Sequence, residues 1–120
     1  MVKPKAHDPI HELLPLTPAV FYILFALAEG EKHGYAIMKE VQNVSGGQFT
    51  MGPGTLYTTV QRLLELGLIE ETATRPDSER RRRCYRLSGT GRKTLEAELS
   101  RMEWLLRSAQ RRNLAPREAR

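Results

Sequence analysis

The chain of 120 residues contains a single cysteine, Cys84, so no disulfide can form within it. The lack of an internal disulfide fits a reducing compartment, and we expect a cytoplasmic protein. Long apolar runs are also missing, because the stretch from Ala19 to Ala28 is far shorter than the about 20 residues of a membrane-spanning helix. Lysines precede this stretch, as in a signal peptide, but Asp8, Pro9 and Glu12 lie between them and the apolar run. We therefore expect no signal peptide.

Patterns of catalytic sites are missing as well. Gly52-Pro53-Gly54 lacks the lysine of a phosphate-binding loop, and no nucleophile motif or acid–base pair of carboxylates is recognisable. His7-Asp8 and His11-Glu12 place two histidines four residues apart, but Pro9 disfavours a helix there and no cysteine cluster supports a metal site. We expect a protein that is not an enzyme and that holds no metal or cofactor.

Acidic residues are too few to balance the basic ones, and the net charge is +5. The excess is concentrated in two segments. Six arginines between Arg75 and Arg86 are accompanied by only two acids, and five between Arg107 and Arg120 by only one, so each segment carries +4. The remaining residues then carry 5 − 8 = −3. Two basic patches on a slightly acidic body indicate an anionic partner.

Helix signals divide the first half of the chain. Residues 1–16 show no periodicity, and we expect an arm that is at least partly flexible. Thr17-Pro18 is a good helix start, which predicts a helix to about residue 28. Apolar spacing predicts a second helix over residues 35–44. A third helix is expected from Gly52-Pro53-Gly54 to Gly67, with an apolar stripe on one side and polar residues on the other.

A hairpin is expected next. A strand should run from Leu68 to about Thr74, followed by a turn at Arg75-Pro76-Asp77-Ser78 and a return strand from Arg81 to Leu87. Alternation places Tyr85 and Leu87 on the inner face and Cys84 on the other. For Cys84, burial or an ordinary strand position is favoured over a redox role, because no second cysteine can resolve it.

A long final helix, capped by Ser88 or Thr90, should end near residue 113, before a basic tail at residues 114–120. It has an apolar seam at steps of four and three residues, as in a helix that pairs with another helix: Leu95, Leu99, Met102, Leu106 and Ala109. The helix of residues 17–28, which includes Phe21 and Phe25, is apolar nearly all round. It lies either at the centre of the domain or partly against a partner. We predict a homodimer formed through the seam and these two phenylalanines.

Three short helices followed by a two-stranded ribbon describe a mainly helical fold with a small hairpin wing, the winged helix-turn-helix. The third helix presents Thr55, Thr58, Gln61 and Arg62, which can hydrogen-bond to base edges or phosphates in a DNA major groove. The hairpin presents Arg80, Arg81, Arg82 and Arg83, which can neutralise phosphates. A solvated helix face and a charged loop are the simpler alternatives. We predict a winged-helix domain over residues 17–87 and a dimerisation helix over residues 88–113.

Several motifs in order resemble the PadR family of transcriptional regulators over about residues 16–106. They are Leu16-Thr17-Pro18, Leu27-Ala28-Glu29-Gly30, His33-Gly34-Tyr35-Ala36-Ile37, Gly52-Pro53-Gly54-Thr55-Leu56-Tyr57, Arg62-Leu63, Gly67-Leu68-Ile69, and Arg82-Arg83-Cys84-Tyr85-Arg86-Leu87-Ser88 with Gly91. The resemblance implies a homodimer on a pseudo-palindromic operator, usually a repressor and sometimes released by a small molecule. It places Tyr57 at the DNA backbone. The single final helix is similar to that of the family's shorter subgroup, in which this helix dimerises. Cys84 departs from the bulkier residue common there.

Trp104 lies half a turn away from the seam of the final helix. It either packs on the helix of residues 17–28 or on a partner, or stacks on a flat ligand, a role that the resemblance implies for this region. His33 is expected at a helix start or in packing. The basic tail serves either solubility or additional DNA affinity. The alternative function is a winged-helix protein-interaction module without specific DNA binding.

Overall fold

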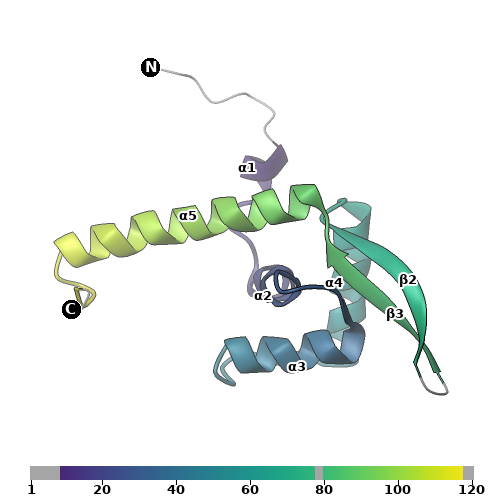
Figure 1. The fold of residues 1–120 in the computed structure, drawn as a ribbon. Helices are drawn as coiled ribbons and strands as arrows, with labels where there is room; N and C mark the ends of the chain where they lie inside the picture. The colour runs from purple at the N-terminus through teal and green to yellow at the C-terminus, as the bar shows by residue number, and fades with distance from the viewer. Residues whose placement is uncertain (1–8, 78–79, 118–120) are drawn as a thin grey trace.

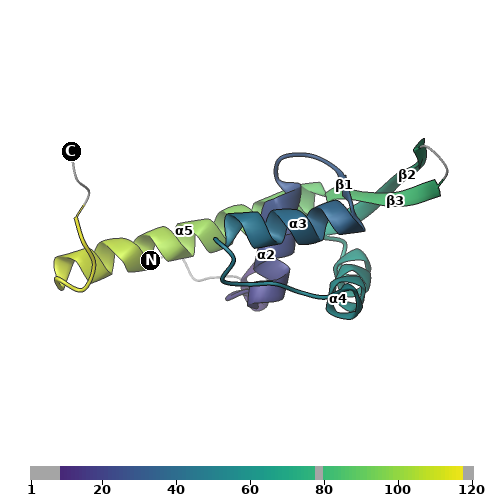
Figure 2. The same cartoon turned by 90° about the horizontal axis from the view of Figure 1, so that it is seen from below.

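The computed structural model describes residues 9–77 and 80–117, and its fold is a winged helix-turn-helix followed by a long helix (Figure 1). The helices are α1 (Pro9–Leu13), α2 (Pro18–Leu27), α3 (Gly34–Val44), α4 (Pro53–Glu65) and α5 (Gly89–Arg111). The strands are β1 (Lys32–His33), β2 (Ile69–Asp77) and β3 (Arg80–Leu87). The β2–β3 hairpin extends from one end of the molecule, and the C-terminal half of α5 projects at the opposite end (Figures 1 and 2). The predicted fold class is confirmed.

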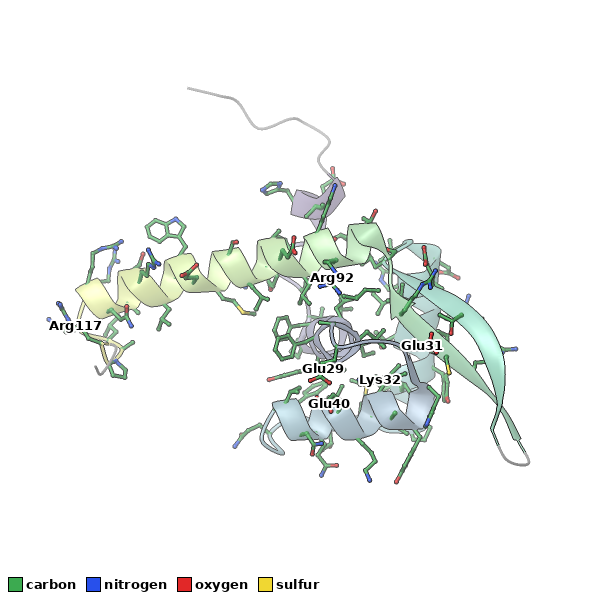
Figure 3. The ribbon with its side chains drawn as sticks, viewed as in Figure 1. Glu29, Glu31, Lys32, Glu40, Arg92 and Arg117 are labelled. Carbon is green, nitrogen blue, oxygen red and sulfur yellow. The ribbon has the colours of Figure 1, made fainter. Side chains whose placement is uncertain are left out.

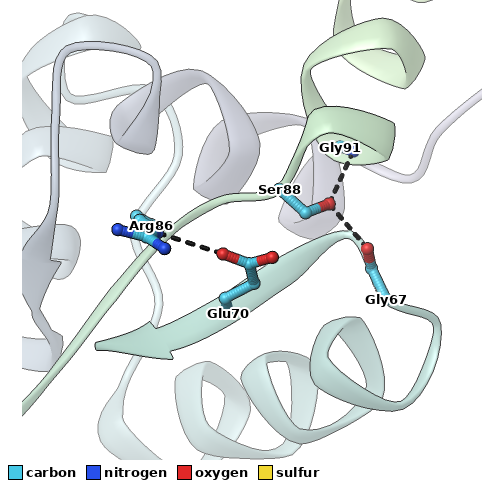
Figure 4. Close-up of polar contacts among 5 residues, drawn as sticks. All are labelled: Gly67, Glu70, Arg86, Ser88 and Gly91. Atoms are coloured by element: carbon cyan, nitrogen blue, oxygen red, sulfur yellow. Dashed lines mark hydrogen bonds and ion pairs between the residues drawn. The ribbon is translucent and has the colours of Figure 1, made fainter. Parts of the chain in front are cut away.

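The helix boundaries lie at residues whose chemistry predicts a helix start or a helix end. The Thr17 hydroxyl accepts a hydrogen bond from the Val20 amide (3.4 Å) at the start of α2. Ser88, rather than Thr90, caps α5 by accepting from the Gly91 amide (2.9 Å). The Ser88 hydroxyl also donates to the Gly67 carbonyl (2.6 Å), which joins the start of α5 to the end of α4 (Figure 4). Gly67 has a φ of +75°, a conformation that glycine adopts without strain.

The core is built around α2. Its residues Ile23, Leu24 and Leu27 are buried against the apolar stripes of α3 and α4. Phe25 remains exposed on one side of the helix. The alternative that places α2 at the centre of the domain is therefore confirmed, and packing of its uncovered apolar side on a partner stays a prediction.

The wing is longer than predicted. β2 runs through to Asp77, with an irregularity between Thr72 and Arg75, so the turn predicted from Arg75 onward is wrong. The sheet order is β1–β3–β2, which leaves β2 at an edge. Proline is tolerated in an edge strand because its missing N–H costs no internal hydrogen bond, and Pro76 therefore does not end β2.

Two elements have no counterpart in the sequence prediction. β1 is only two residues long and pairs with β3, with His33 opposite Cys84. This third strand lies beside Cys84, which is buried. The expectation that Pro9 disfavours a helix is wrong, because proline occupies the first turn of α1, where its missing donor is harmless. His7 and Asp8 lie outside the described residues.

α1 and the segment after it pack against α5 (Figure 1). The Leu16 amide donates to a carboxylate oxygen of Glu98 at 3.0 Å. The arm is thus anchored to α5 from residue 9 onward. In the described part of the chain, the helices are all too short or too polar to cross a membrane.

Candidate nucleic-acid interface

The outer face of α4 carries the polar residues predicted to contact DNA. Leu56, Val60 and Leu63 are buried on the inner face of this helix. The predicted contact residues on α4 are all exposed: Thr55, Tyr57, Thr58, Gln61 and Arg62. Four of them line a shallow hollow of about 570 Å³ together with Glu65: Tyr57, Thr58, Gln61 and Arg62. The structure therefore brings the predicted α4 residues together on one accessible surface.

Tyr57 is half-exposed, with 50% of its surface accessible, and its ring reaches across to the start of α3. Its hydroxyl lies where a β-carbon on Gly34 would have to be. Gly34 is the first residue of α3, and the His33 side chain caps this helix by accepting from the Ala36 amide (3.3 Å). Glycine at position 34 thus lets the α4 tyrosine lie against α3, and the expected helix-start role of His33 is confirmed.

The backbone of β3 carries the arginine run along the outer part of the hairpin, where Arg82, Arg81 and Arg80 pair with residues 75–77 of β2. The side chains of these three arginines lie outside the described part of the structure. Arg83 is exposed, and its Nε lies 3.7 Å from a carboxylate oxygen of Glu71. Exposed ion pairs of this kind contribute little to stability, so Arg83 can exchange Glu71 for a phosphate.

The base of the wing contains a second pair and a buried phenol. Arg86 and Glu70 face each other on neighbouring strands, with Nε 3.0 Å from the carboxylate (Figure 4). Tyr85 is buried, and its pKa is raised by burial first and then by the nearby Glu71 and Tyr57. Arg83 opposes this shift. The phenol of Tyr85 therefore stays protonated at neutral pH and acts as part of the core.

The residues predicted to form a dimer divide into two groups. Leu95 is 4% exposed and packs in the protomer's own core, so it is not available to a partner. Leu99 and Met102 are 38% and 36% exposed, and Leu106 is exposed further along α5. On α2, Phe21 stacks on Phe25 with ring centroids 5.5 Å apart. The exposed part of the seam thus begins at Leu99.

Trp104 does not pack on α2, since 61% of its surface is accessible. The Arg111 guanidinium lies over the indole, 5.5 Å from the ring centroid. Both residues line a hollow of about 360 Å³ with Ser100, Glu103 and Arg107. The alternative in which Trp104 packs on the helix of residues 17–28, now α2, is therefore wrong. Contact of Trp104 with a partner or with a ligand stays a prediction.

Sequence analysis missed a buried carboxylate on α5. Glu98 is 1% exposed and binds Arg101 in a bidentate pair, with Nε–Oε1 at 2.6 Å and Nη2–Oε2 at 3.1 Å. The hydrogen bond from Arg101 lowers the pKa of Glu98; burial opposes this shift, and the Leu16 amide adds to it. The pKa of Arg101 is raised in return. A Glu–Arg spacing of three on a helix is a common surface pattern, and only the distant Leu16 distinguishes this pair.

Over residues 9–77 and 80–117, no group of three or more histidine, cysteine or acidic side chains is placed to hold a metal ion. A polar helix beside a basic hairpin, on three helices and a small sheet, defines a winged helix-turn-helix protein.

Comparison with known proteins agrees with this class. The model of the transcriptional regulator PadR-like family matches residues 23–97. The chain belongs to the PadR-like family of transcriptional regulators.

The relatives found by sequence align with this chain over only part of their own length. An uncharacterised 37.1 kDa protein of transposon TN4556 from Streptomyces fradiae is 41% identical over 81 residues, which are 67% of this chain and 21% of that protein. The transcriptional regulator YqjI of Escherichia coli is 38% identical over 47 residues, which are 39% of this chain and 23% of that protein. The chain thus spans less than a quarter of the length of these two relatives.

Solved structures share the fold. A PadR family transcription regulator from Clostridium difficile is similar with a TM-score of 0.68 at 23% identity, covering 79% of this chain and 97% of that one. Bacillus subtilis PadR in complex with operator DNA is similar with a TM-score of 0.63 at 24% identity, covering 71% of this chain and 48% of that one. RosR of H. salinarum is similar with a TM-score of 0.59 at 27% identity, covering 80% of this chain and 79% of that one.

Proposed function

We propose that this regulator binds double-stranded DNA through α4 and the β2–β3 hairpin. The observation that supports this most directly is the exposed polar face of α4, whose hollow is lined by Tyr57, Thr58, Gln61 and Arg62 beside a basic wing. In the similar structure of Bacillus subtilis PadR the protein is bound to operator DNA. We assign Thr58 and Gln61 to base edges in the major groove, and Tyr57 to the phosphate backbone.

The wing supplies contacts that do not depend on sequence. Arg80, Arg81, Arg82 and Arg83 lie along the backbone or minor groove next to the site of α4, where guanidinium groups neutralise phosphates. Thr55 and Arg62 flank the central α4 contacts on the same exposed face.

The test separates these two kinds of contact. In Arg81→Ala/Arg82→Ala/Arg83→Ala, affinity should fall equally for the operator and for random duplexes. In Thr58→Ala and Gln61→Ala, the preference among base substitutions should change instead. An unchanged affinity of the arginine variant would remove the wing from the interface.

We further propose a homodimer on a pseudo-palindromic operator. Leu99, Met102 and Leu106 on α5, with Phe21 and Phe25 on α2, form an apolar surface that the protomer leaves partly uncovered. Residues 17–87 then act as the DNA-binding domain and residues 88–113 as the dimerisation helix. The basic tail adds charge at the far end of α5, where Figure 3 places Arg117.

Repression, with release by a small molecule, is the regulatory mode that we propose. Trp104 and Arg111 line an open hollow in which a flat aromatic molecule can stack on the indole. Trp104 is the only tryptophan, so its fluorescence reports binding directly. Saturable quenching by a flat aromatic compound, accompanied by release of DNA, supports this mode, and quenching without release contradicts it.

The second candidate is a winged-helix module that binds protein. Ion pairs between β2 and β3, Arg83–Glu71 and Arg86–Glu70, offset part of the wing's charge, and this is the observation that supports the second candidate. Binding that resists salt would support it, because an apolar protein interface does not weaken as salt rises.

A further inference from the structure

An apolar groove lies between the arm and the end of α4. Its volume is about 100 Å³. Leu13, Leu16 and Val20 line it from the arm and α2, and Leu66 and Leu68 from the end of α4. Leu13, Leu16 and Val20 are half-buried, and Leu66 is exposed, so the groove is apolar and open to solvent.

Arg62 is the one charged side chain among the described residues that line the groove. The same side chain lines the hollow on the outer face of α4. Arg62 therefore borders two surfaces: the proposed DNA contact on one side and the apolar groove on the other. A molecule that binds Arg62 from the groove competes with DNA for this guanidinium.

The groove also connects the two helices to which we assign functions, α4 and α5. Leu16 contributes its side chain to the groove, while its amide donates to the buried carboxylate of Glu98 on α5. Leu66 caps the end of α4 on the opposite wall. A ligand between these walls touches the segment held by the dimerisation helix and the end of the proposed recognition helix at once.

We propose that this groove is an effector site for a short aliphatic carboxylate. The apolar walls fit the alkyl chain, and Arg62 at the rim fits the carboxylate. The volume is below the roughly 150 Å³ of a cavity that accepts benzene, which favours a slender, unbranched chain over a ring. The competition with DNA rests on the function proposed above, whereas ligand binding itself does not.

Hexanoate is the first probe, with hexan-1-ol as its uncharged match. Methyl NMR of the full chain should show shifts at Leu13, Leu16, Val20 and Leu66, with affinity in about the millimolar range for so few atoms. Hexanoate should bind about threefold to fivefold tighter than hexan-1-ol, because an ion pair at an exposed arginine adds a modest amount. Equal affinity for both, or shifts at Trp104 instead, would overturn the assignment.

Variants locate the site. Arg62→Gln should reduce hexanoate affinity to that of the alcohol. Leu66→Glu places a second carboxylate at the rim and should abolish hexanoate binding. Leu114→Glu makes the same change at a more exposed leucine beyond α5 (76% against 41% accessible) and should not. Val20→Phe fills the groove and should also abolish hexanoate binding. If Val20→Phe does not fold, Leu66→Glu remains as the test. Retained binding in Leu66→Glu would overturn the proposal. Shifts of the groove methyl signals on deletion of residues 1–8, or on dilution of the protein, would also overturn the proposal. They would show that the arm or a second copy of the chain fills the groove.

The final step adds duplex DNA at constant ionic strength. Hexanoate should weaken DNA binding by the wild type and have no effect on Arg62→Gln. Ligand binding without any DNA binding would overturn the proposed function and leave the groove assigned. Ligand binding with unchanged DNA affinity would overturn the sharing of Arg62 alone.

Discussion

The hydroxyl of Tyr57 on α4 lies against Gly34 at the start of α3, in the space that any β-carbon at position 34 would need. This contact fixes the direction of an exposed tyrosine that we assign to the DNA backbone. It is made by the end of a side chain that is itself half-exposed, so the ring can swing outward if it is displaced.

Gly34→Ala should therefore separate stability from DNA binding. The free energy of unfolding should change by less than about 1 kcal/mol, because the displaced ring moves into solvent. The affinity for duplex DNA, measured by fluorescence anisotropy, should fall about tenfold because each protomer then binds one phosphate fewer. An unchanged affinity would show that the direction of Tyr57 is unimportant.

Gly91→Ala should show the opposite pattern. A β-carbon at position 91 collides with the carbonyl oxygen of Leu68, which is backbone and cannot swing away. We expect a loss of about 2–3 kcal/mol in urea unfolding. Gly89→Ala is the matched control, since nothing lies within 4 Å of its β-carbon position, and its stability should stay close to that of the wild type. Equal stability of both variants would contradict the close approach of α5 to the Leu68 backbone.

Glu98 should make stability depend on pH. Its pKa in the folded protein lies below the ordinary value of 4.5, because Arg101 and the Leu16 amide stabilise the carboxylate. The stabilisation is thus fully present above the pKa of the unfolded chain and is lost as pH falls through the lower, folded-state pKa.

Glu98→Gln should lose about 1–2 kcal/mol at pH 7, a value reduced by the partial exposure of Arg101, and its unfolding curves should change less between pH 7 and pH 3. Glu103→Gln is the control, because Glu103 forms an exposed pair with Arg107 (3.0 Å) on the same helix and should contribute little. If the two variants behaved alike, the anchoring of the arm through Glu98 would be wrong.

The apolar seam of α5 gives a prediction about assembly. Leu99→Asp and Met102→Glu should convert the proposed dimer to monomers on sizing chromatography, because each places an unpaired charge in the proposed interface. Leu114→Asp, which changes an exposed leucine outside the seam, should leave the assembly unchanged. A persistent dimer in the first two variants would show that the chains associate through another surface.

Local chemistry accounts for the parts of the fold that sequence predicts. Thr17 and Ser88 are side chains that cap a helix from its own first turn, and Gly67 adopts a backbone conformation that ends one. The polar face of α4 follows from helical spacing alone. These signals are complete within a few residues, so they are visible without any knowledge of the rest of the chain.

The features that sequence analysis missed depend on distant residues. β1 has only two residues and is a strand because β3 lies beside it. Pro76 stays in β2 because that strand is at an edge, which is a property of the sheet. The Leu16–Glu98 hydrogen bond spans 82 positions in the sequence, and the placement of Arg62 beside the arm likewise appears only once the chain is folded.

The most direct test of DNA recognition by α4 and the wing is binding to duplex from the protein's own promoter region, measured at several salt concentrations against random competitor DNA. We predict binding that resists competitor and weakens steeply with salt. The salt slope should flatten by about one unit for each phosphate that Arg81→Ala/Arg82→Ala/Arg83→Ala no longer neutralises. Weak binding that competitor removes, or a salt slope identical in wild type and variant, would contradict DNA recognition by these two elements.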